Sequence, residues 1–157
     1  MTITARSSTT IRTPAAFAWD FLRVYANDPR WRSGLDEMTQ DPPGPVQNGA
    51  RVREVLRVLG RTVQSLVEVS DVHDHGFTWR VTRGAIAEGS RSVVPLDADS
   101  CRVDIVKHVT LTGSDRLLTP LLTLVIRRTE HQDLHRAKHL LEAEWPAQRD
   151  EPRAEWR

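Results

Sequence analysis

The sequence has little of what secreted, membrane-spanning and nucleic-acid-binding proteins need. A single cysteine, Cys101, excludes an internal disulfide and suits a reducing cytoplasm. The longest apolar run, Leu117–Ile126, is far shorter than the roughly 20 residues that span a bilayer, and the first ten residues lack the apolar segment of a signal peptide. With 22 basic and 21 acidic residues, the net charge of +1 creates no field that attracts nucleic acid. We expect a cytoplasmic monomer or homodimer that neither binds nucleic acid nor inserts into a membrane.

Several motifs of catalysis and cofactor binding are also missing. The chain has neither a G-x-S-x-G nucleophile elbow nor a G-x-x-x-x-G-K phosphate loop, and we expect no cofactor. His131, His135 and His139 repeat every four residues, a spacing found among metal ligands on a helix. This stripe falls opposite Ala137 and Leu141, on the predicted solvent face, and other zinc-binding patterns are absent. We therefore predict no metal site.

The remaining patterns of the sequence predict mostly strands, followed by one long helix. Residues 2–11 are rich in β-branched residues and predict a strand, and Thr13-Pro14 opens a helix with Thr13 as N-cap. A second short helical turn is expected near residues 28–31, followed by a weak strand at 35–40. Alternating apolar and polar residues then predict five strands: 50–59, 61–72, 77–83, 87–96, whose two faces are ambiguous, and 101–111.

The segment from Ser114 to about Trp145 predicts the long helix, with Pro146 as its stop. Pro120 leaves open that the regular helix begins nearer Thr119. Because residues 117–126 are apolar almost all round, we expect the sheet to wrap them. Short connections make the sheet antiparallel, and its one apolar face needs this helix as a cover. We expect one domain over residues 1–145 and a flexible tail over 146–157.

Sparse landmarks in this order resemble the START-like superfamily, the polyketide cyclase/dehydrase and lipid-transport family. The landmarks are Thr13-Pro14-Ala15, Trp31, Gly49, Phe77-Thr78-Trp79, Cys101-Arg102-Val103 (where the family usually has Thr-Arg-Val) and Leu134-x-x-x-Lys138-x-x-Leu141-Glu142. The resemblance implies an α+β helix-grip fold: about seven curved antiparallel strands wrapped around a long C-terminal helix, with two short helices after the first strand. It also implies an apolar tunnel that holds lipids, hormones, quinones or polyketides, in which some members catalyse ring closure, dehydration or hydrolysis.

Two charged residues fall on predicted inward faces. Glu54 shares a face with Val52 and Leu56, and Lys107 is in register with Ile105. An ionised group there is costly unless it is paired or lies next to water. Glu54 can be a general acid or base with Lys107 as its partner or as a donor to a ligand oxygen. Alternatively, the two form a structural ion pair, or they lie where the strands twist out to solvent. We take both as candidate catalytic residues.

The candidate ligand-binding residues come from the same inward faces. They are Trp31, Val52, Leu56, Phe77, Trp79 and Ile105, together with Leu122, Ile126 and Thr129 of the last helix. Phe77 is better explained as a core residue, and Trp31 and Trp79 can equally be core. Thr129 and Asp133 can simply mark where the helix leaves the sheet. The sequence predicts a protein that encloses a small apolar, polyketide-like molecule and promotes its cyclisation or dehydration. The alternative is a carrier of a lipid, quinone or polyketide that performs no chemistry.

Overall fold

A computed structural model describes residues 1–150 of the chain. Seven strands form one sheet, and three of the four helices are short. In chain order the elements are β1 Thr2–Ile11, α1 Ala15–Leu22, the 3₁₀ helix η1 Tyr25–Arg30, β2 Leu35–Asp41, β3 Arg51–Val58, β4 Arg61–His73, β5 Gly76–Arg83, β6 Ile86–Asp97, β7 Ser100–Thr110, the 3₁₀ helix η2 Gly113–Leu118 and α2 Thr119–Asp150.

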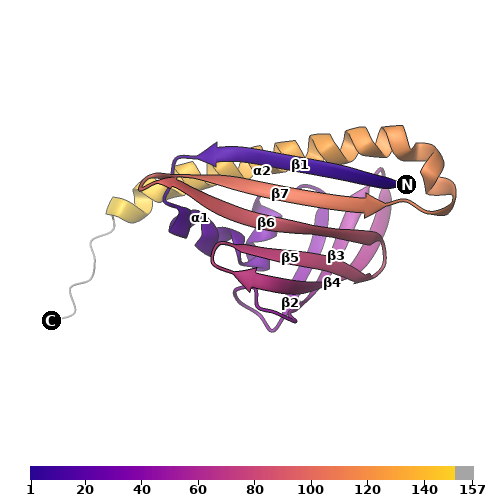
Figure 1. The fold of residues 1–157 in the computed structure, drawn as a ribbon, viewed down its shortest axis with the longest axis horizontal. Coiled ribbons are helices and arrows are strands. Elements are labelled where there is room, and N and C mark those ends of the chain that lie inside the picture. Colours follow the sequence, from indigo (N-terminus) through magenta and orange to yellow (C-terminus); the bar gives the residue numbers. More distant parts are fainter. Residues whose placement is uncertain (151–157) are drawn as a thin grey trace.

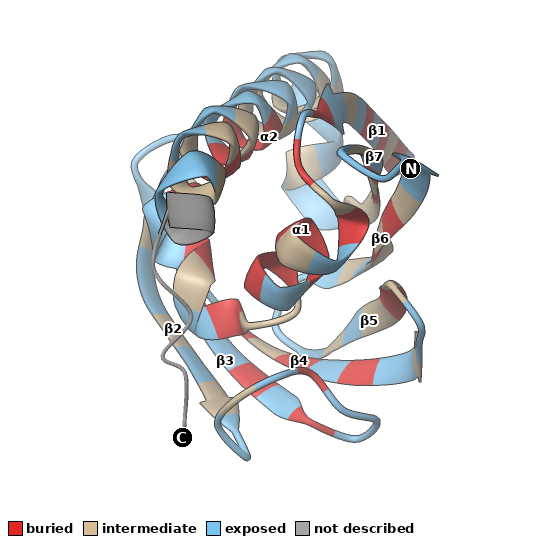
Figure 2. Ribbon diagram, turned by 90° about the vertical axis from the view of Figure 1, so that its left-hand side faces the viewer, coloured by how far each residue is buried: buried red, intermediate tan, exposed pale blue. Residues whose placement is uncertain are grey.

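The sheet is antiparallel, and its order along the hydrogen-bonded edges is β1-β7-β6-β5-β4-β3-β2. Each strand from β2 to β7 therefore pairs with its neighbour in the sequence, and only β1 joins from a distance, opposite β7. α2 runs along the β1 side, and the sheet curves away beneath it (Figure 1). Seen end-on, α1 lies between α2 and the concave sheet face (Figure 2). The predicted helix-grip fold is confirmed.

Alternation of side chains buries the inner face of this sheet. Val52 and Glu54 of β3 are buried, whereas Arg51 and Arg53, which alternate with them, are exposed. On β6, whose faces the sequence left open, Arg91 and Val93 point inward. α1 and the second half of α2 close the core over this face. Their buried side chains include Ala18, Leu22, Leu134, Ala137 and Leu141.

The start of the first helix differs from its prediction. Pro14 occupies the N-cap position and no side chain caps the helix, so Thr13 is not the cap. The buried hydroxyl of Thr13 has no hydrogen-bond partner that meets standard geometry among residues 1–147. The second helical turn is η1, which begins earlier than expected, at Tyr25.

The end of α2 also differs, because Pro146 lies inside the helix, which continues to Asp150. A single proline removes one backbone hydrogen bond, and contacts on the last turns offset this loss. The Trp145 ring packs 5.0 Å from that of Phe17, and Arg30 forms an ion pair with Glu144. The start agrees with the alternative set by Pro120, since η2 precedes an α-helix that begins at Thr119. Residues 151–157 of the predicted tail lie outside the described residues.

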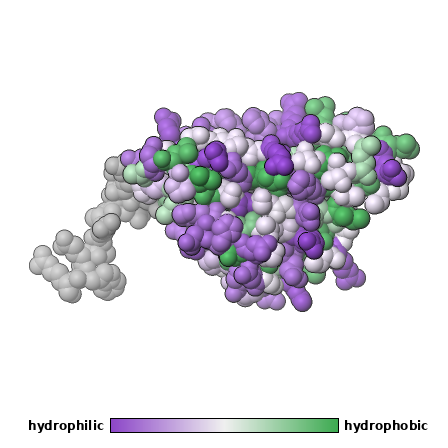
Figure 3. Space-filling view, viewed as in Figure 1, coloured by the Kyte–Doolittle hydropathy of each residue, from purple (hydrophilic) through white to green (hydrophobic). Residues whose placement is uncertain are grey.

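The expectation that the sheet wraps residues 117–126 is wrong. Leu117 is 85% exposed and Leu124 65%, and Leu118 and Leu121 are exposed as well. Only one side of this part of α2 faces the sheet, through the half-buried Leu122 and Ile126. Apolar surface is visible at the end of the molecule where η2 and the start of α2 lie (Figure 3). Within residues 1–150, every helix is too short or too polar to cross a bilayer.

Candidate functional site

A cavity lies between α2 and the inner face of the sheet, where the sequence predicted a ligand site. Its volume is about 40 Å³, which holds a few water molecules rather than an organic ligand. Five of its eleven lining residues carry a charge. The lining consists of Tyr25, Trp31, Arg32, Val52, Glu54, Val67, Trp79, Arg91, Ile105, Lys107 and Glu130. The roomy apolar tunnel expected from the resemblance is therefore replaced by a small, partly ionic chamber in which charged side chains lie among aromatic and aliphatic ones.

Arg32 connects one wall of the chamber to the inside of β3. Its Nη2 donates to Oε1 of Glu54 at 2.6 Å, and its Nη1 donates to Oδ2 of Asp28 at 3.2 Å. Glu54 projects inward from β3 because it alternates with exposed arginines. The predicted pairing of Glu54 with Lys107 is wrong, since the guanidinium of Arg32 is the partner of Glu54.

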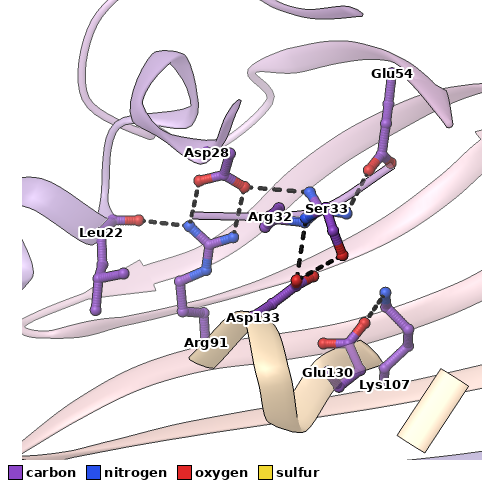
Figure 4. Close-up of polar contacts among 9 residues, drawn as sticks. All are labelled: Leu22, Asp28, Arg32, Ser33, Glu54, Arg91, Lys107, Glu130 and Asp133. Atoms are coloured by element: carbon purple, nitrogen blue, oxygen red, sulfur yellow. Dashed lines mark hydrogen bonds and ion pairs between the residues drawn. The ribbon is translucent and has the colours of Figure 1, made fainter. Parts of the chain in front are cut away.

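Asp28 and Arg91 form the most deeply buried ion pair of this cluster (Figure 4). Nη1 and Nη2 of Arg91 donate to the two carboxylate oxygens of Asp28 at 3.0 and 2.8 Å, and Nη1 also donates to the carbonyl of Leu22 at 2.7 Å. The guanidinium carbon lies 5.0–5.5 Å from the ring centres of Tyr25, Trp31 and Phe77. This bidentate pair anchors η1 to β6 and, through Asp28, holds Arg32 in place.

Lys107 of β7 pairs with Glu130 of α2 across the chamber (Figure 4). Burial is the largest influence and acts to raise the pKa of the Glu130 carboxyl. The charge and hydrogen bond of Lys107, together with the charges of Arg32 and Arg91, outweigh burial and hold that pKa below its ordinary value. Glu130 is therefore ionised at neutral pH while Lys107 stays beside it. Removal of the ammonium would leave burial as the dominant influence and make the carboxylate a stronger base.

Two aromatic residues shape the rest of the wall. Trp79 lies on β5 opposite Gly89 of β6, where an added Cβ would come within 2.6 Å of the indole ring. Trp79 also lies 6.0 Å from the Lys107 ammonium. The buried Nε1–H of Trp31 has no hydrogen-bond partner among residues 1–147. Burial raises the pKa of the Tyr25 hydroxyl, so this group stays protonated.

The structure brings together six of the eleven predicted site residues. Those that line the chamber are Trp31, Val52, Glu54, Trp79, Ile105 and Lys107. Phe77 lies in the core behind it, against Trp19 and Tyr25. Leu56, Leu122, Ile126 and Thr129 lie outside the lining. Their role as ligand contacts remains a prediction.

Besides Val67, sequence reasoning missed five polar residues that line or support the chamber: Tyr25, Asp28, Arg32, Arg91 and Glu130. Two had a usable signal. Arg91 pairs with Phe77 on one side and Ile105 on the other, and both point inward, so hairpin register would have placed it inside. Glu130 follows Ile126 by one four-residue step along the inner helix face. Asp28 precedes a proline, which indicates a turn residue. Arg32 lies between two elements, where no alternation or helical spacing assigns it to a face.

Asp133 and the histidine stripe lie outside the chamber. Oδ1 of Asp133 accepts hydrogen bonds from the backbone N–H and the hydroxyl of Ser33, at 3.0 and 2.7 Å, and so ties α2 to the segment after η1. Burial raises the pKa of this carboxyl above its ordinary value. The histidine stripe lies on the outer face of α2, as predicted, with His135 exposed. No cluster of three or more histidine, cysteine or acidic side chains suited to a metal occurs within the described chain.

Comparison with solved structures supports the fold assignment. The protein TTHA0849 from Thermus thermophilus is 16% identical over 90% of this chain and 98% of its own, with a TM-score of 0.77. The Zhui aromatase/cyclase from Streptomyces sp. R1128 is 15% identical over 92% and 96%, with a TM-score of 0.75. A START superfamily protein from Mycobacterium smegmatis is 13% identical over 93% and 99%, with a TM-score of 0.64. At these identities the likeness shows the fold alone.

Sequence comparison gives a family rather than an individual relative. No curated protein matches the chain. The sequence pattern of one family, described as polyketide cyclase/dehydrase and lipid transport, matches residues 2–142. That match spans every strand and most of α2, including all the residues that line the chamber. The chain therefore belongs to the polyketide cyclase/dehydrase and lipid-transport family.

Proposed function

We propose that this protein binds a polyketide-like molecule, apolar but rich in oxygen atoms, and promotes its cyclisation and dehydration. The observation that carries the proposal is the ionic chamber under α2, where Lys107, Glu130 and Glu54 meet in one cavity. An apolar guest alone gains nothing from these charges, whereas carbonyl and enolate oxygens can bind to Lys107 and Arg32. The family description, polyketide cyclase/dehydrase, is consistent with this chemistry.

The chemistry follows from the Lys107–Glu130 pair. A ligand carbonyl oxygen that binds the Lys107 ammonium would draw it away from Glu130, whose carboxylate then becomes a stronger base. Glu130 would take a proton from the carbon beside that carbonyl, and the ammonium would stabilise the enolate oxygen. The enolate carbon would attack a second carbonyl to close a ring, and the resulting alkoxide would take up a proton. Loss of water, through proton removal and hydroxide departure, would complete the dehydration.

Binding must enlarge the chamber, because pockets for such ligands measure about 300–1,000 Å³. The first half of α2 is the element best able to move. Its leucines Leu121 and Leu124 are exposed, and its inner residues Leu122 and Ile126 are only half-buried. The second half, with Leu134 and Leu141 buried, is held in the core. Opening at the first half would expose the Lys107–Glu130 pair and leave the Asp28–Arg91 pair sealed.

A non-catalytic carrier is the second candidate. The half-buried apolar residues Leu56, Leu122 and Ile126 beyond the chamber favour it, because they offer surface to a lipid or quinone tail. Native mass spectrometry of the purified protein discriminates the two functions. A ligand that co-purifies unchanged supports the carrier, and conversion of a linear poly-β-ketone probe to a cyclised product with loss of water supports the enzyme.

The residue assignment is tested with Glu54→Gln, Lys107→Met and Glu130→Gln on the same probe. We expect Lys107→Met and Glu130→Gln to lower turnover by at least about 100-fold, the usual range for loss of an acid–base group. Lys138→Met is the matched control, because the only other lysine of the chain lies on α2 outside the chamber. Unchanged turnover in all three chamber variants would exclude the proposed roles.

A further inference from the structure

The outer face of α2 brings two imidazoles together. His135 and His139 are one helical turn apart on this face. Their Nε2 atoms lie 2.9 Å apart, and their rings stand at 88° to each other. His131, one turn earlier on the same face, does not share this arrangement. Its ring lies parallel to that of His135 at a centroid distance of 6.4 Å.

From this geometry, and against the sequence-based prediction of no metal site, we propose that His135 and His139 form a two-histidine chelate for a divalent transition metal of the copper(II) or nickel(II) type. Two nitrogens bound to one metal at about 2.0–2.1 Å are separated by about 2.9 Å when the angle at the metal is 90°, and by about 3.3 Å when it is tetrahedral. Without metal, the 2.9 Å between the two Nε2 atoms is a hydrogen-bond distance, and it is already close to the separation that right-angled coordination needs. Right-angled nitrogen coordination suits copper(II) and nickel(II), whereas zinc prefers a tetrahedron.

The surroundings permit a cation at this place. The two nearest cationic side chains of α2 turn elsewhere: Arg136 donates to the carbonyl of Trp31 at 2.9 Å, and Lys138 faces Glu142 at 4.0 Å. The imidazole contact is open to solvent, so water or a second ligand can complete the coordination. Without metal, one Nε2–H donates to the other Nε2, which keeps the pair converged. The chelate lies on the face of α2 opposite the chamber and is independent of the proposed catalytic function.

Binding is measured by titrating the metal-free full-length protein with copper(II), nickel(II) and zinc(II), and the copper ligands are identified by electron paramagnetic resonance. We expect one copper ion with two nitrogen ligands in a tetragonal spectrum, and weaker binding of nickel and zinc. His135→Ala and His139→Ala should each weaken copper binding by about tenfold or more, because each removes half of the protein ligands. Binding to either variant at wild-type affinity would overturn the proposal.

His131→Ala is the matched control, since it removes a histidine of the same stripe whose ring does not converge with its neighbour. We expect this variant to retain wild-type affinity. Loss of binding in His131→Ala would overturn the two-ligand chelate in favour of a three-histidine site. Tighter binding of zinc than of nickel would overturn the right-angle geometry. Circular dichroism of each variant checks that α2 is intact, and a change confined to metal affinity supports the proposal.

Discussion

The two ion pairs Asp28–Arg91 and Lys107–Glu130 lie in the same interior but differ in how completely they are buried and hydrogen-bonded. Asp28 is fully buried and its partner Arg91 is 7% exposed, with both carboxylate oxygens bonded and three aromatic rings around the guanidinium. Lys107 and Glu130 are 19% and 14% exposed, have one mutual contact and line the cavity. A fully satisfied buried pair is rigid, whereas a partly hydrated pair can exchange its partner for a ligand. The comparison separates the charges that hold the fold from those available for chemistry.

Asp28→Asn should have the largest effect on stability. It leaves the buried guanidinium of Arg91 without its charge partner and weakens the hold on Arg32. Breaking one partner of such a pair typically lowers the free energy of unfolding by about 3–5 kcal/mol. Urea denaturation measures the change. The double variant Asp28→Asn, Arg91→Met should recover part of the loss, and a single variant as stable as wild type would show that this pair is not structural.

Lys107→Met should cost less, about 1–3 kcal/mol, because its pair with Glu130 is partly exposed and Glu130 can take up a proton when the ammonium is lost. The methionine side chain retains most of the apolar contact with Trp79. Urea denaturation of the Lys107→Met and Asp28→Asn variants under the same conditions compares the two losses in free energy of unfolding directly. A loss as large as that of Asp28→Asn would remove the distinction between the two pairs.

The stability of the protein at acid pH should depend on Glu130, which belongs to the ion pair beside the cavity. The pKa of Glu130 is lower in the folded than in the unfolded protein, so its ion pair stabilises the fold above the unfolded pKa of about 4.5. This contribution disappears as the pH falls through the lower folded pKa. Glu130→Gln should therefore flatten the acid side of the stability curve below about pH 4.5 and change it little at pH 7 beyond a constant offset. An unaltered acid limb in thermal melts would contradict the assignment.

The smallest effect should be the coupling between the two pairs. A double-mutant cycle with Asp28→Asn and Lys107→Met should give an interaction energy below about 0.5 kcal/mol, as for sites without a shared hydrogen-bond partner. Arg32 contacts Asp28 and Glu54 and acts on Glu130 through its charge alone, since no hydrogen bond joins it to Lys107 or Glu130 within residues 1–147. A coupling above about 1 kcal/mol would mean that the two pairs act as one network.

Much of this site followed from alternation along the strands. Glu54, Lys107, Val52 and Ile105 were predicted to point inward, and all four line the chamber. The partners of the charges did not follow, because Arg32 and Glu130 come from a loop and from α2 and meet β3 and β7 only through tertiary packing. Periodicity assigns a residue to a face, but it does not say which charges on different elements come within reach.

The two halves of α2 show the same limit. In residues 134–141 the apolar side chains recur at helical spacing on one side, and Leu134, Ala137 and Leu141 are buried. Residues 117–126 were expected to be enclosed because they are apolar on all sides, yet Leu117 and Leu124 face solvent. Hydropathy shows that a segment can be buried. Only the position of the sheet decides which side of the segment becomes buried.

The sequence by itself determined the strand–helix order, the antiparallel sheet, the inner faces of β3 and β7 and the covering helix, since these depend on local periodicity and short connections. The tertiary structure alone decided how the buried charges pair, how small the chamber is and which leucines remain exposed. Those features depend on how neighbouring elements are placed relative to one another after they pack. Ångström-scale offsets decide whether a carboxylate meets a guanidinium or an ammonium, and side-chain volumes decide what space is left between helix and sheet.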